Sequence, residues 1–310
     1  MVHESFDPAG RPRRVGMLAG WGRYPIVVAE ALRRQGRELY CIGVRGHADP
    51  ALAELATDFR TSGVAKFGWA IRYFRRHGVT AATMAGKVHK ARLFRRFGWW
   101  THLPDWRTIR MFTHHLLTRR KDLRDDTILR TICDEFASEG IHFSPATDFV
   151  PELLVKPGQW TARGPSAWQW KDIRFGWRMA KELGRLDIGQ SVAVKDQAVL
   201  AVEAIEGTDE CIRRAGALCR SGGFTVVKVA KPQQDMRFDV PTIGRGTIET
   251  MAAAGAKVLA VEAGRTILLD QAEVVALADR LGLVVVALED SAAVSPGAPA
   301  ATDDSAPQVT

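Results

Sequence analysis

The chain has 310 residues, of which 46% are hydrophobic, and a formal net charge of +8 at pH 7. This length and composition allow more than one hydrophobic core, which favours two domains and argues against a small binding module. Met1 to Arg14 contains no apolar run that could serve as a signal peptide or a membrane span, so we expect a cytoplasmic protein. The cysteines match no zinc or redox spacing and are expected to be reduced: Cys41, Cys133, Cys211 and Cys219.

The positive charge is concentrated between Lys87 and Arg124, where eleven Lys or Arg residues stand against two acids. The same segment contains six large aromatics, namely Phe94, Phe97, Trp99, Trp100, Trp106 and Phe112. Cations mixed with interfacial aromatics favour an anionic membrane surface as a partner. Single-stranded nucleic acid suits similar chemistry, and so does a solvated basic helix whose aromatics pack in a core. No nucleic-acid-binding motif accompanies the charge, so we expect no nucleic-acid partner.

Strand and helix patterns alternate over residues 14–144, which follow an N-terminus expected to be disordered at 1–13. The predicted strands are 14–19, 38–44 and 79–85, and the predicted helices are 25–35, 64–76 and 125–139. Strands that are separated by helices form parallel sheets covered on both faces. The sequence therefore predicts an α/β domain of Rossmann-like type with a mainly parallel sheet.

Four prolines and two glycines with little periodicity predict a linker over 145–166. A second α/β domain, expected to be the catalytic one, is predicted over 167–289. Its predicted strands are 191–195, 198–204, 225–229, 257–261, 266–269 and 284–288, and its predicted helices are 168–183, 208–219, 247–254 and 273–281. The first two of these strands flank a short turn and predict a hairpin. Residues 290–310 lack core-forming side chains and are expected to be a disordered tail.

A Gly-x-Gly turn follows the first predicted strand, with Gly20 and Gly22 ahead of the first helix. Backbone N–H groups and the helix dipole favour a phosphate at such a position, although a purely structural turn is the alternative. Pro25 stands where the dinucleotide fingerprint has its third glycine. Asp49 lies near, but not at, the end of the second strand. A nicotinamide-dependent oxidoreductase is therefore a weaker hypothesis.

Acidic and polar side chains gather on both sides of the predicted hairpin. They are Asp187, Gln190, Glu203, Glu206, Thr208 and Asp209. Thr208 and Asp209 could either bind a ligand or cap the following helix. Glu203 lies in an apolar run, where a buried carboxylate usually needs a cation, a metal or a ligand donor.

The strand at 225–229 continues into a polar loop, residues 231–244, in which cations and aspartates alternate. Its charged and amide members include Lys231, Gln234, Asp235, Arg237 and Asp239. Cleavage of a pyrophosphate needs neutralisation of the phosphate charge and an oriented water, which cations and a carboxylate-held metal can supply. Carboxylate oxygens suit Mg²⁺ or Mn²⁺. A solvated turn without chemistry is the alternative.

Six of these strings together resemble the LpxI family in order and spacing, over residues 14–288. They are Gly20–Pro25, Ala85–Val88, Gly184–Gln190, Leu200–Asp209, Lys231–Gly244 and Val261–Gly264. The resemblance implies hydrolysis of UDP-2,3-diacylglucosamine to UMP and 2,3-diacylglucosamine 1-phosphate in lipid A biosynthesis, with Mg²⁺ required. It also implies two α/β domains that hold the lipid between them. The family's essential aspartate corresponds to Asp239.

The residues and the resemblance together give a set of expected site residues, with Asp239 as the catalytic one. The expected substrate-binding residues are Gly20, Gly22, Lys87, Asp187, Gln190, Thr208, Asp209, Lys231, Gln234, Arg237 and Glu262. The expected metal ligands are Asp239, Glu203, Glu206, Asp125 and Asp126. Asp125 follows Arg124, where the family commonly has Gly. The expected partners are a UDP-linked acylated glucosamine, an anionic membrane on the inner face of the inner membrane, and a second copy of the chain.

Overall fold

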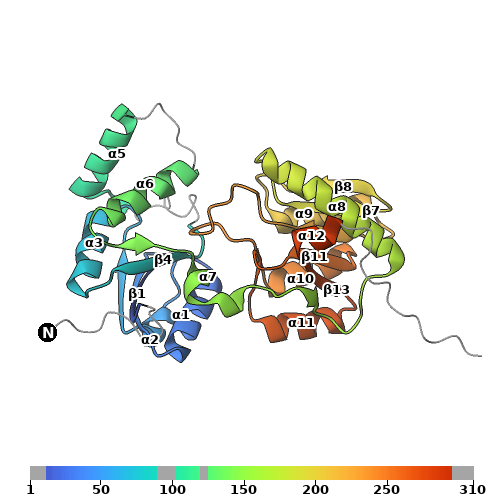
Figure 1. Ribbon diagram of the computed structural model, residues 1–310, viewed down its shortest axis with the longest axis horizontal. Helices are drawn as coiled ribbons and strands as arrows, with labels where there is room; N and C mark the ends of the chain where they lie inside the picture. The colour runs from blue at the N-terminus through green and yellow to red at the C-terminus, as the bar shows by residue number, and fades with distance from the viewer. Residues whose placement is uncertain (1–11, 89–101, 119–124, 295–310) are drawn as a thin grey trace, which may run out of the picture. The chain divides into compact units, whose positions relative to one another are not determined.

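The computed structural model describes residues 12–88, 102–118 and 125–294. The chain divides into two compact units, each built around its own β-sheet (Figure 1). The N-terminal unit comprises residues 1–151 together with Asp235–Asp239, and the C-terminal unit comprises the rest. The segment Asp235–Asp239 therefore belongs to a different unit from the residues that flank it in sequence.

The N-terminal unit contains a parallel sheet with the strand order β3-β2-β1-β4-β5. Its strands are β1 (Arg14–Ala19), β2 (Glu38–Val44), β3 (Asp58–Ser62), β4 (Ala81–Ala85) and β5 (His142–Phe143). Its helices are α1 (Tyr24–Arg34), α2 (Leu52–Leu55), α3 (Phe67–Arg76), α5 (Trp106–Thr118), α6 (Asp125–Ala137) and α7 (Ala146–Phe149). The strand order reverses between β1 and β4, and ligands of open α/β sheets bind at such switch points. The predicted Rossmann-like sheet is thus confirmed.

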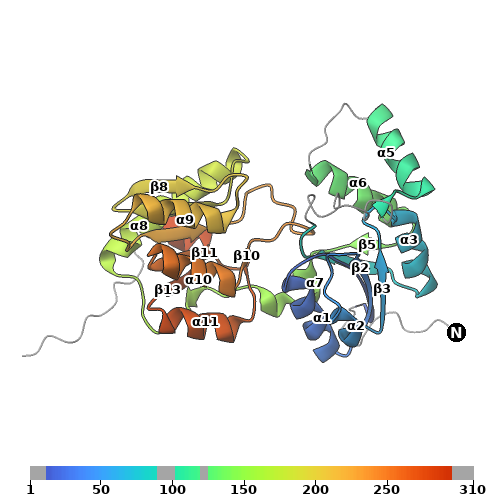
Figure 2. The same cartoon turned by 180° about the vertical axis from the view of Figure 1, so that it is seen from behind.

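Helices cover both faces of this sheet, as right-handed crossovers between parallel strands require. Helices α3, α5 and α6 share one hydrophobic cluster with the strands, in which Phe74 and Phe136 are fully buried. Helix α1 packs against β2 and β4, and α2 packs against α1. Figure 2 shows α1 and α2 from behind, beside β2 and β3. The core accounts for the apolar spacing that predicted α3 and α6.

The C-terminal unit contains a six-stranded mixed sheet in the order β6-β13-β11-β9-β7-β8. Its strands are β6 (Gly158–Gln159), β7 (Ser191–Lys195), β8 (Ala198–Val202), β9 (Thr225–Lys228), β11 (Val258–Glu262) and β13 (Val284–Leu288). Strands β9, β11 and β13 are parallel, whereas β7 and β8 form the predicted antiparallel hairpin. A separate short pair joins β10 (Thr242–Ile243) and β12 (Ile267–Leu268).

Two hydrophobic clusters lie on opposite faces of the C-terminal sheet, so its central strands are buried on both sides. One cluster contains α9 (Thr208–Leu218), α10 (Arg245–Ala254) and α11 (Gln271–Arg280), and the other contains α8 (Ala167–Arg185) and α12 (Asp290–Val294). Successive side chains of β9 pack on opposite faces of the sheet: Val226 lies in the first cluster and Val227 in the second. Burial on both faces explains the continuous apolar runs from which these strands were predicted.

Several short elements carry little apolar periodicity and escaped the sequence analysis. The expected linker at 145–166 contains α7, the 3-10 helix Pro151–Leu153 and the edge strand β6, which pairs with β13. Strand β3 has the sequence DFRTS and lies at the edge of its sheet, so alternating apolar residues are not required of it. The start of the expected tail forms α12, whereas 295–310 and 1–11 lie outside the described residues.

All four cysteines are free and buried, as expected. Burial raises the pKa of the Cys41 thiol to about 12, so this group stays protonated and packs as a small apolar side chain. No helix among the described residues has both the length and the apolar composition needed to cross a bilayer. Half of the basic aromatic segment predicted to face a membrane, residues 89–101 and 119–124, lies outside the described part of the chain.

Candidate active site

The expected phosphate turn lies at the switch point of the N-terminal sheet, where the ends of β1 and β4 meet. Gly20 N–H donates to Ala85 O at 2.8 Å, and Trp21 N–H donates to Lys87 O at 2.7 Å. A Cβ atom at Gly20 would lie 2.7 Å from Lys87 O, so the two loops can approach this closely only because residue 20 is glycine. Gly20 and Lys87, both predicted to bind substrate, therefore lie side by side, and Gly22 follows Gly20 in the same turn. Two of the turn's N–H groups are already engaged, and the exposed Lys87 side chain is its available cation.

Asp49 was considered as a ligand for the ribose of a nicotinamide cofactor, and the structure shows it in a different role. Its Oδ1 accepts a hydrogen bond at 2.9 Å from Ala51 N–H, which begins the turn into α2. This is a local structural role of a kind common for aspartate in turns.

A buried polar cluster marks the carboxyl end of β9 in the C-terminal unit. Lys228 is 6% exposed, and its Nζ donates to Thr208 Oγ1 at 2.9 Å and to Thr242 O at 3.3 Å. The Thr208 hydroxyl in turn donates to Glu203 Oε1 at 2.9 Å. Glu203 is 7% exposed, and its Oε2 has no hydrogen-bond partner among the described residues. A buried acceptor without a partner is costly, and it leaves coordination capacity for a ligand or an ion.

Two helices begin beside this cluster without a side-chain cap. The N-caps are Gly207 for α9 and Gly244 for α10, and neither helix end has a side-chain cap hydrogen bond. The capping role considered for Thr208 and Asp209 is therefore absent. Thr208 binds Lys228 and Glu203 instead, and Asp209 Oδ1 accepts from Thr247 Oγ1 at 3.0 Å, which links the two helix starts. Uncapped helix N-termini next to a buried lysine offer N–H donors and a cation to phosphate oxygens, alongside the acids Glu203, Asp209 and Glu210.

Glu262, predicted to bind substrate, is 4% exposed at the end of β11. Its Oε1 accepts from Lys181 Nζ at 2.8 Å, and its Oε2 accepts from Ala230 N–H at 2.8 Å. Both carboxylate oxygens are thus occupied by the protein. Glu262 holds the first residues of the polar loop against the sheet, which is a positioning role.

The motif Gly184–Gln190 surrounds the start of the same loop. Lys231 Nζ forms an ion pair with Asp187 Oδ1 at 2.8 Å, and Gln234 Oε1 accepts from Lys231 N–H at 2.9 Å. Gln190 O accepts from Val229 N–H at 3.0 Å. The predicted residues Asp187, Gln190, Lys231 and Gln234 are therefore brought together. They shape the loop that leaves β9.

Gly189 in this motif faces the backbone of Glu203. A Cβ atom at position 189 would lie 1.9 Å from Glu203 O, which no side chain can accommodate without a backbone shift. Gly189 thereby fixes the distance between this motif and the chain that carries the buried carboxylate.

The segment Asp235–Asp239 carries the expected catalytic residue into the N-terminal unit. Asp235 accepts hydrogen bonds from Arg237 Nε at 2.9 Å and from Arg237 Nη2 at 2.6 Å, and it pairs with Arg130 Nε of α6 at 3.6 Å. The Arg237 hydrogen bond lowers the pKa of the Asp235 carboxyl, against the opposing effect of burial. Phe238 packs against the hydrophobic cluster of α3, α5 and α6. Arg237, predicted to bind substrate, is thus committed to holding the segment.

Asp239 itself is exposed, and its N–H donates to Asp235 O at 3.1 Å. Its carboxylate forms no hydrogen bond or ion pair with any described residue. An exposed carboxylate on a firmly anchored backbone can accept a proton, a water or a metal ion. This geometry agrees with the catalytic role implied by the resemblance.

The five expected metal ligands differ in what they can still bind. Glu206 is engaged with Arg214 Nη2 and with Ala204 N–H, so its oxygens are occupied. Asp125 and Asp126 begin α6, and the structure describes their backbone but not their side chains. Glu203 and Asp239 retain free oxygens. Within the described ranges there is no group of three or more acids, histidines or cysteines able to hold a metal. Mg²⁺ often takes one or two carboxylates and completes its shell with substrate phosphates and water, so the carboxylate of each of these residues, taken by itself, has the donor chemistry of a Mg²⁺ ligand.

Sequence reasoning did not single out Phe238, and it counted Lys228 only among the charges that converge on the polar loop, not as a site residue. Lys228 stands alone as a charge within an apolar strand, a pattern that signals either a partner or a ligand. Phe238 is the aromatic neighbour of Asp239 in an otherwise polar loop. The lone charge and the isolated aromatic are both visible in the sequence. Their contacts, which indicate a role at the site, are visible only in the folded structure.

An α/β protein of two units, with a buried lysine and uncapped helix starts in one unit and a free carboxylate on an anchored segment of the other, has the kinds of groups found in enzymes that act on phosphate esters or anhydrides. Two family models match the chain: the LpxI N-terminal domain over residues 14–153 and the LpxI C-terminal domain over residues 156–286. A curated relative, the UDP-2,3-diacylglucosamine pyrophosphatase LpxI of Caulobacter vibrioides (strain ATCC 19089 / CIP 103742 / CB 15), is 33% identical over 285 residues. That alignment covers 89% of this chain and 98% of the relative. This chain belongs to the LpxI family.

Proposed function

We propose that this protein hydrolyses the pyrophosphate bond of UDP-2,3-diacylglucosamine, which yields UMP and 2,3-diacylglucosamine 1-phosphate for lipid A biosynthesis. The observation that carries the proposal is the match to a pyrophosphatase of that name along nearly the full length of both chains. The polar geometry supports it, because a diphosphate substrate needs cations and N–H donors together with a carboxylate that can direct water.

Lys228 and the uncapped starts of α9 and α10 are the proposed contacts for phosphate oxygens in the C-terminal unit. Lys228 is already held by Thr208 and Thr242, so little side-chain entropy is lost when an anion binds. Thr208 can rotate its hydroxyl between Glu203 and a ligand oxygen, since a hydroxyl both donates and accepts. These residues bind and orient the diphosphate.

Asp239 is the proposed catalytic residue. Its carboxylate is free to accept the proton of an attacking water or to orient that water, and its backbone is fixed by Asp235, Arg237 and Phe238. Fixing the backbone matters because a catalytic group misplaced by about 1 Å loses on the order of a hundredfold in rate.

We further propose that activity depends on Mg²⁺, which Mn²⁺ can replace, with either Asp239 of the N-terminal unit or Glu203 of the C-terminal unit as a residue that would hold it. A bound divalent ion supplies charge neutralisation at the diphosphate and a lowered pKa of bound water. The unpartnered Oε2 of Glu203 and the free carboxylate of Asp239 support this proposal. EDTA is expected to abolish turnover, and excess Mg²⁺ should restore it.

We also propose a peripheral, cytoplasmic location on an anionic membrane, where a lipid substrate can enter the protein without crossing water. In the described part of the basic segment, α5 exposes Trp106, at 78%, beside Ile109 and Arg110. Vesicle sedimentation tests this proposal: binding should require anionic lipid and should weaken for Trp106→Ala. Equal sedimentation with neutral and anionic vesicles at low salt would contradict it. Assembly of two or more copies stays a prediction that a measurement of mass in solution tests.

Product analysis tests the proposed reaction itself. The purified protein is incubated with UDP-2,3-diacylglucosamine and Mg²⁺, and the products are separated, identified and quantified by mass spectrometry. UMP and 2,3-diacylglucosamine 1-phosphate in equal amounts are the expected result. Release of UDP and the free sugar, or no turnover by a folded protein, would refute the proposal.

A further inference from the structure

A pocket with a volume of about 560 Å³ lies in the N-terminal unit, and its lining contains none of the site residues assigned above. It opens at the carboxyl ends of β2 and β3 and at the start of α3. Its lining residues are Arg45, Thr61, Ser62, Gly63, Lys66, Trp69, Arg72 and Asp105. Arg45 N–H donates to Ser62 O at 2.9 Å, which joins the turn after β2 to the end of β3 and gives the pocket a fixed wall. Pockets of this size hold small organic molecules.

Three cations line this pocket against one carboxylate. Arg45, Lys66 and Arg72 form no ion pair and no side-chain hydrogen bond with any described residue. Other arginines of the same unit are paired, for example Arg60 with Asp58 at 3.3 Å. Like charges gathered at one opening repel one another, and a bound anion relieves that repulsion.

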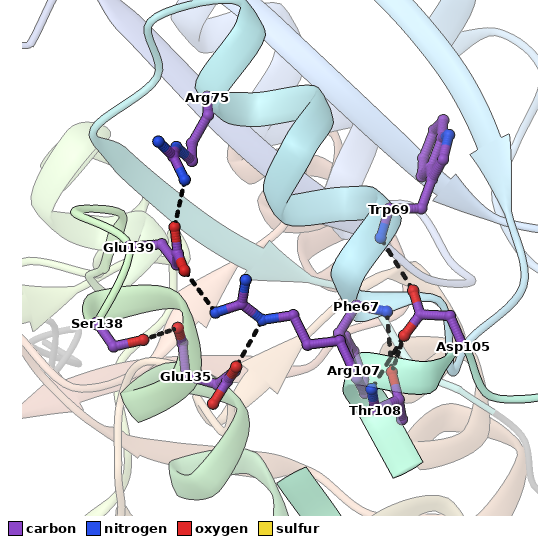
Figure 3. A network of polar contacts seen from close by, with 9 residues as sticks. All are labelled: Phe67, Trp69, Arg75, Asp105, Arg107, Thr108, Glu135, Ser138 and Glu139. Carbon is purple, nitrogen blue, oxygen red and sulfur yellow. Dashed lines mark hydrogen bonds and ion pairs between the residues drawn. The ribbon is translucent and has the colours of Figure 1, made fainter. Parts of the chain in front are cut away.

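The carboxylate of the pocket, Asp105, is committed elsewhere (Figure 3). Its Oδ2 accepts from Trp69 N–H at 3.0 Å, and its Oδ1 accepts from the N–H and the hydroxyl of Thr108 at 2.9 and 2.8 Å. Asp105 therefore satisfies the starts of α3 and α5. Its charge interacts with Arg72, so one carboxylate offsets part of the charge of three cations and the lining keeps a net positive charge. Burial lowers the pKa of His102, and the nearby His47 and Arg45 lower it further.

We propose that this pocket binds an organic phosphate, with the phosphate at Arg45, Lys66 and Arg72 and the organic part against the indole of Trp69. The hydroxyls of Thr61 and Ser62 add polar partners at the same opening. Trp69 is half-buried and stacks on Tyr73 at a centroid distance of 5.5 Å, so its ring is held in one orientation. A rigid aromatic beside cations is the chemistry that recognises a nucleoside monophosphate. The pocket contains none of the proposed catalytic residues, so this binding goes beyond the hydrolytic site.

Isothermal titration of metal-free protein with UMP, AMP and inorganic phosphate tests the inference at low salt. The wild type is compared with the double variant Lys66→Ala/Arg72→Ala. The charge-matched control is Arg76→Ala/Arg110→Ala, which removes two exposed cations outside the pocket. At least one nucleotide should bind about tenfold or more tightly than inorganic phosphate, and the pocket variant should lose about tenfold in affinity while the control does not.

The pattern among the probes identifies the source of the ligand. Preference for UMP over AMP assigns the pocket to the nucleotide product of the proposed reaction, and equal binding of both assigns it to nucleotides in general. Equal affinity for inorganic phosphate and both nucleotides, or unchanged affinity in the pocket variant, overturns the inference. Because neither removed cation forms an ion pair or a side-chain hydrogen bond with a described residue, the thermal midpoint of the variant should not fall markedly. If it does fall, Arg45→Ala, which alters only the turn after β2, provides the same comparison.

Discussion

Asp235 receives two guanidinium hydrogen bonds from Arg237, at 2.9 and 2.6 Å, four residues before the exposed carboxylate of Asp239 ends the same segment. The segment is anchored a second time by Phe238, which packs into the core of the N-terminal unit. The proposed catalytic group is thus carried by a loop of the C-terminal sequence but held by the N-terminal unit.

Phe238→Ala should lower kcat by about tenfold or more, because loss of the aromatic anchor lets the Asp239 backbone move. Phe238→Leu, which keeps an apolar contact, should recover most of the rate. The exposed Leu218 of α9 provides the control, and Leu218→Ala should leave kcat unchanged. Steady-state kinetics and thermal midpoints are measured together. A parallel loss of stability and rate in Ala and Leu variants alike would show that Phe238 only supports the fold.

Lys228→Met should reduce the free energy of unfolding by about 1–3 kcal/mol, because it removes the buried donor that serves Thr208 Oγ1 and Thr242 O. The double variant Glu203→Gln/Lys228→Met should lose less than the sum of the two single variants, since the charges are removed together. Urea denaturation gives these values. Lys231→Met is the matched control: its ion pair with Asp187 is partly exposed, so it should cost about 1 kcal/mol or less. Additive losses would indicate that Glu203 and Lys228 do not depend on each other.

The sequence predicted the long elements well, because their apolar periodicity records which face is buried. Helix α8 and the hairpin of β7 and β8 are examples, and both lie within a few residues of the expected bounds. Strand β3 and strand β6 were missed since edge strands need little apolar character. The sequence also brought Asp187 and Lys231 into one predicted site, where the structure pairs them.

Other parts of the site depend on contacts that no pattern along the chain reveals. Glu262 was expected to bind substrate, yet Lys181 and Ala230 occupy its oxygens, and Lys181 comes from a helix far away in sequence. The return of Asp235–Asp239 to the N-terminal unit is a property of tertiary packing alone. Periodicity predicts burial, but it does not say which buried side chain is the partner.

Gly189→Ala should strongly reduce both stability and activity, because its Cβ atom would lie 1.9 Å from Glu203 O and must push that chain away. Gly246→Ala in α10 is the contrasting substitution, since no atom lies within 4 Å of the added methyl group. It should leave stability unchanged or raise it by up to about 1 kcal/mol through helix propensity. Circular dichroism melts and turnover measurements compare the two. A benign Gly189→Ala variant would mean that the motif and Glu203 are not held at this distance.

Asp105→Ala should lower the free energy of unfolding by about 1–3 kcal/mol. It removes the side-chain acceptor that serves the starts of both α3 and α5 (Figure 3). Burial opposes ionisation of Asp105, but hydrogen bonds from Thr108 and Trp69 and the charge of Arg72 lower its pKa below the ordinary value of 3.8. A lowered folded-state pKa gives stability that is present above pH 4 and lost as pH falls through the folded pKa. The difference in free energy of unfolding between the wild type and the variant should therefore become smaller as the pH is lowered. A difference in free energy of unfolding that stays constant down to pH 2 would contradict the capping role of Asp105.

The most direct test of the account is the kcat of Asp239→Ala for hydrolysis of UDP-2,3-diacylglucosamine in the presence of Mg²⁺. The carboxylate is exposed and has no partner among the described residues, so its removal should leave the thermal midpoint and substrate affinity nearly unchanged. The rate should fall by about a hundredfold or more, since the group acts in the transition state. Glu273→Ala, which removes another exposed carboxylate, should keep full activity. Turnover near the wild-type rate by a folded Asp239→Ala protein would contradict the account.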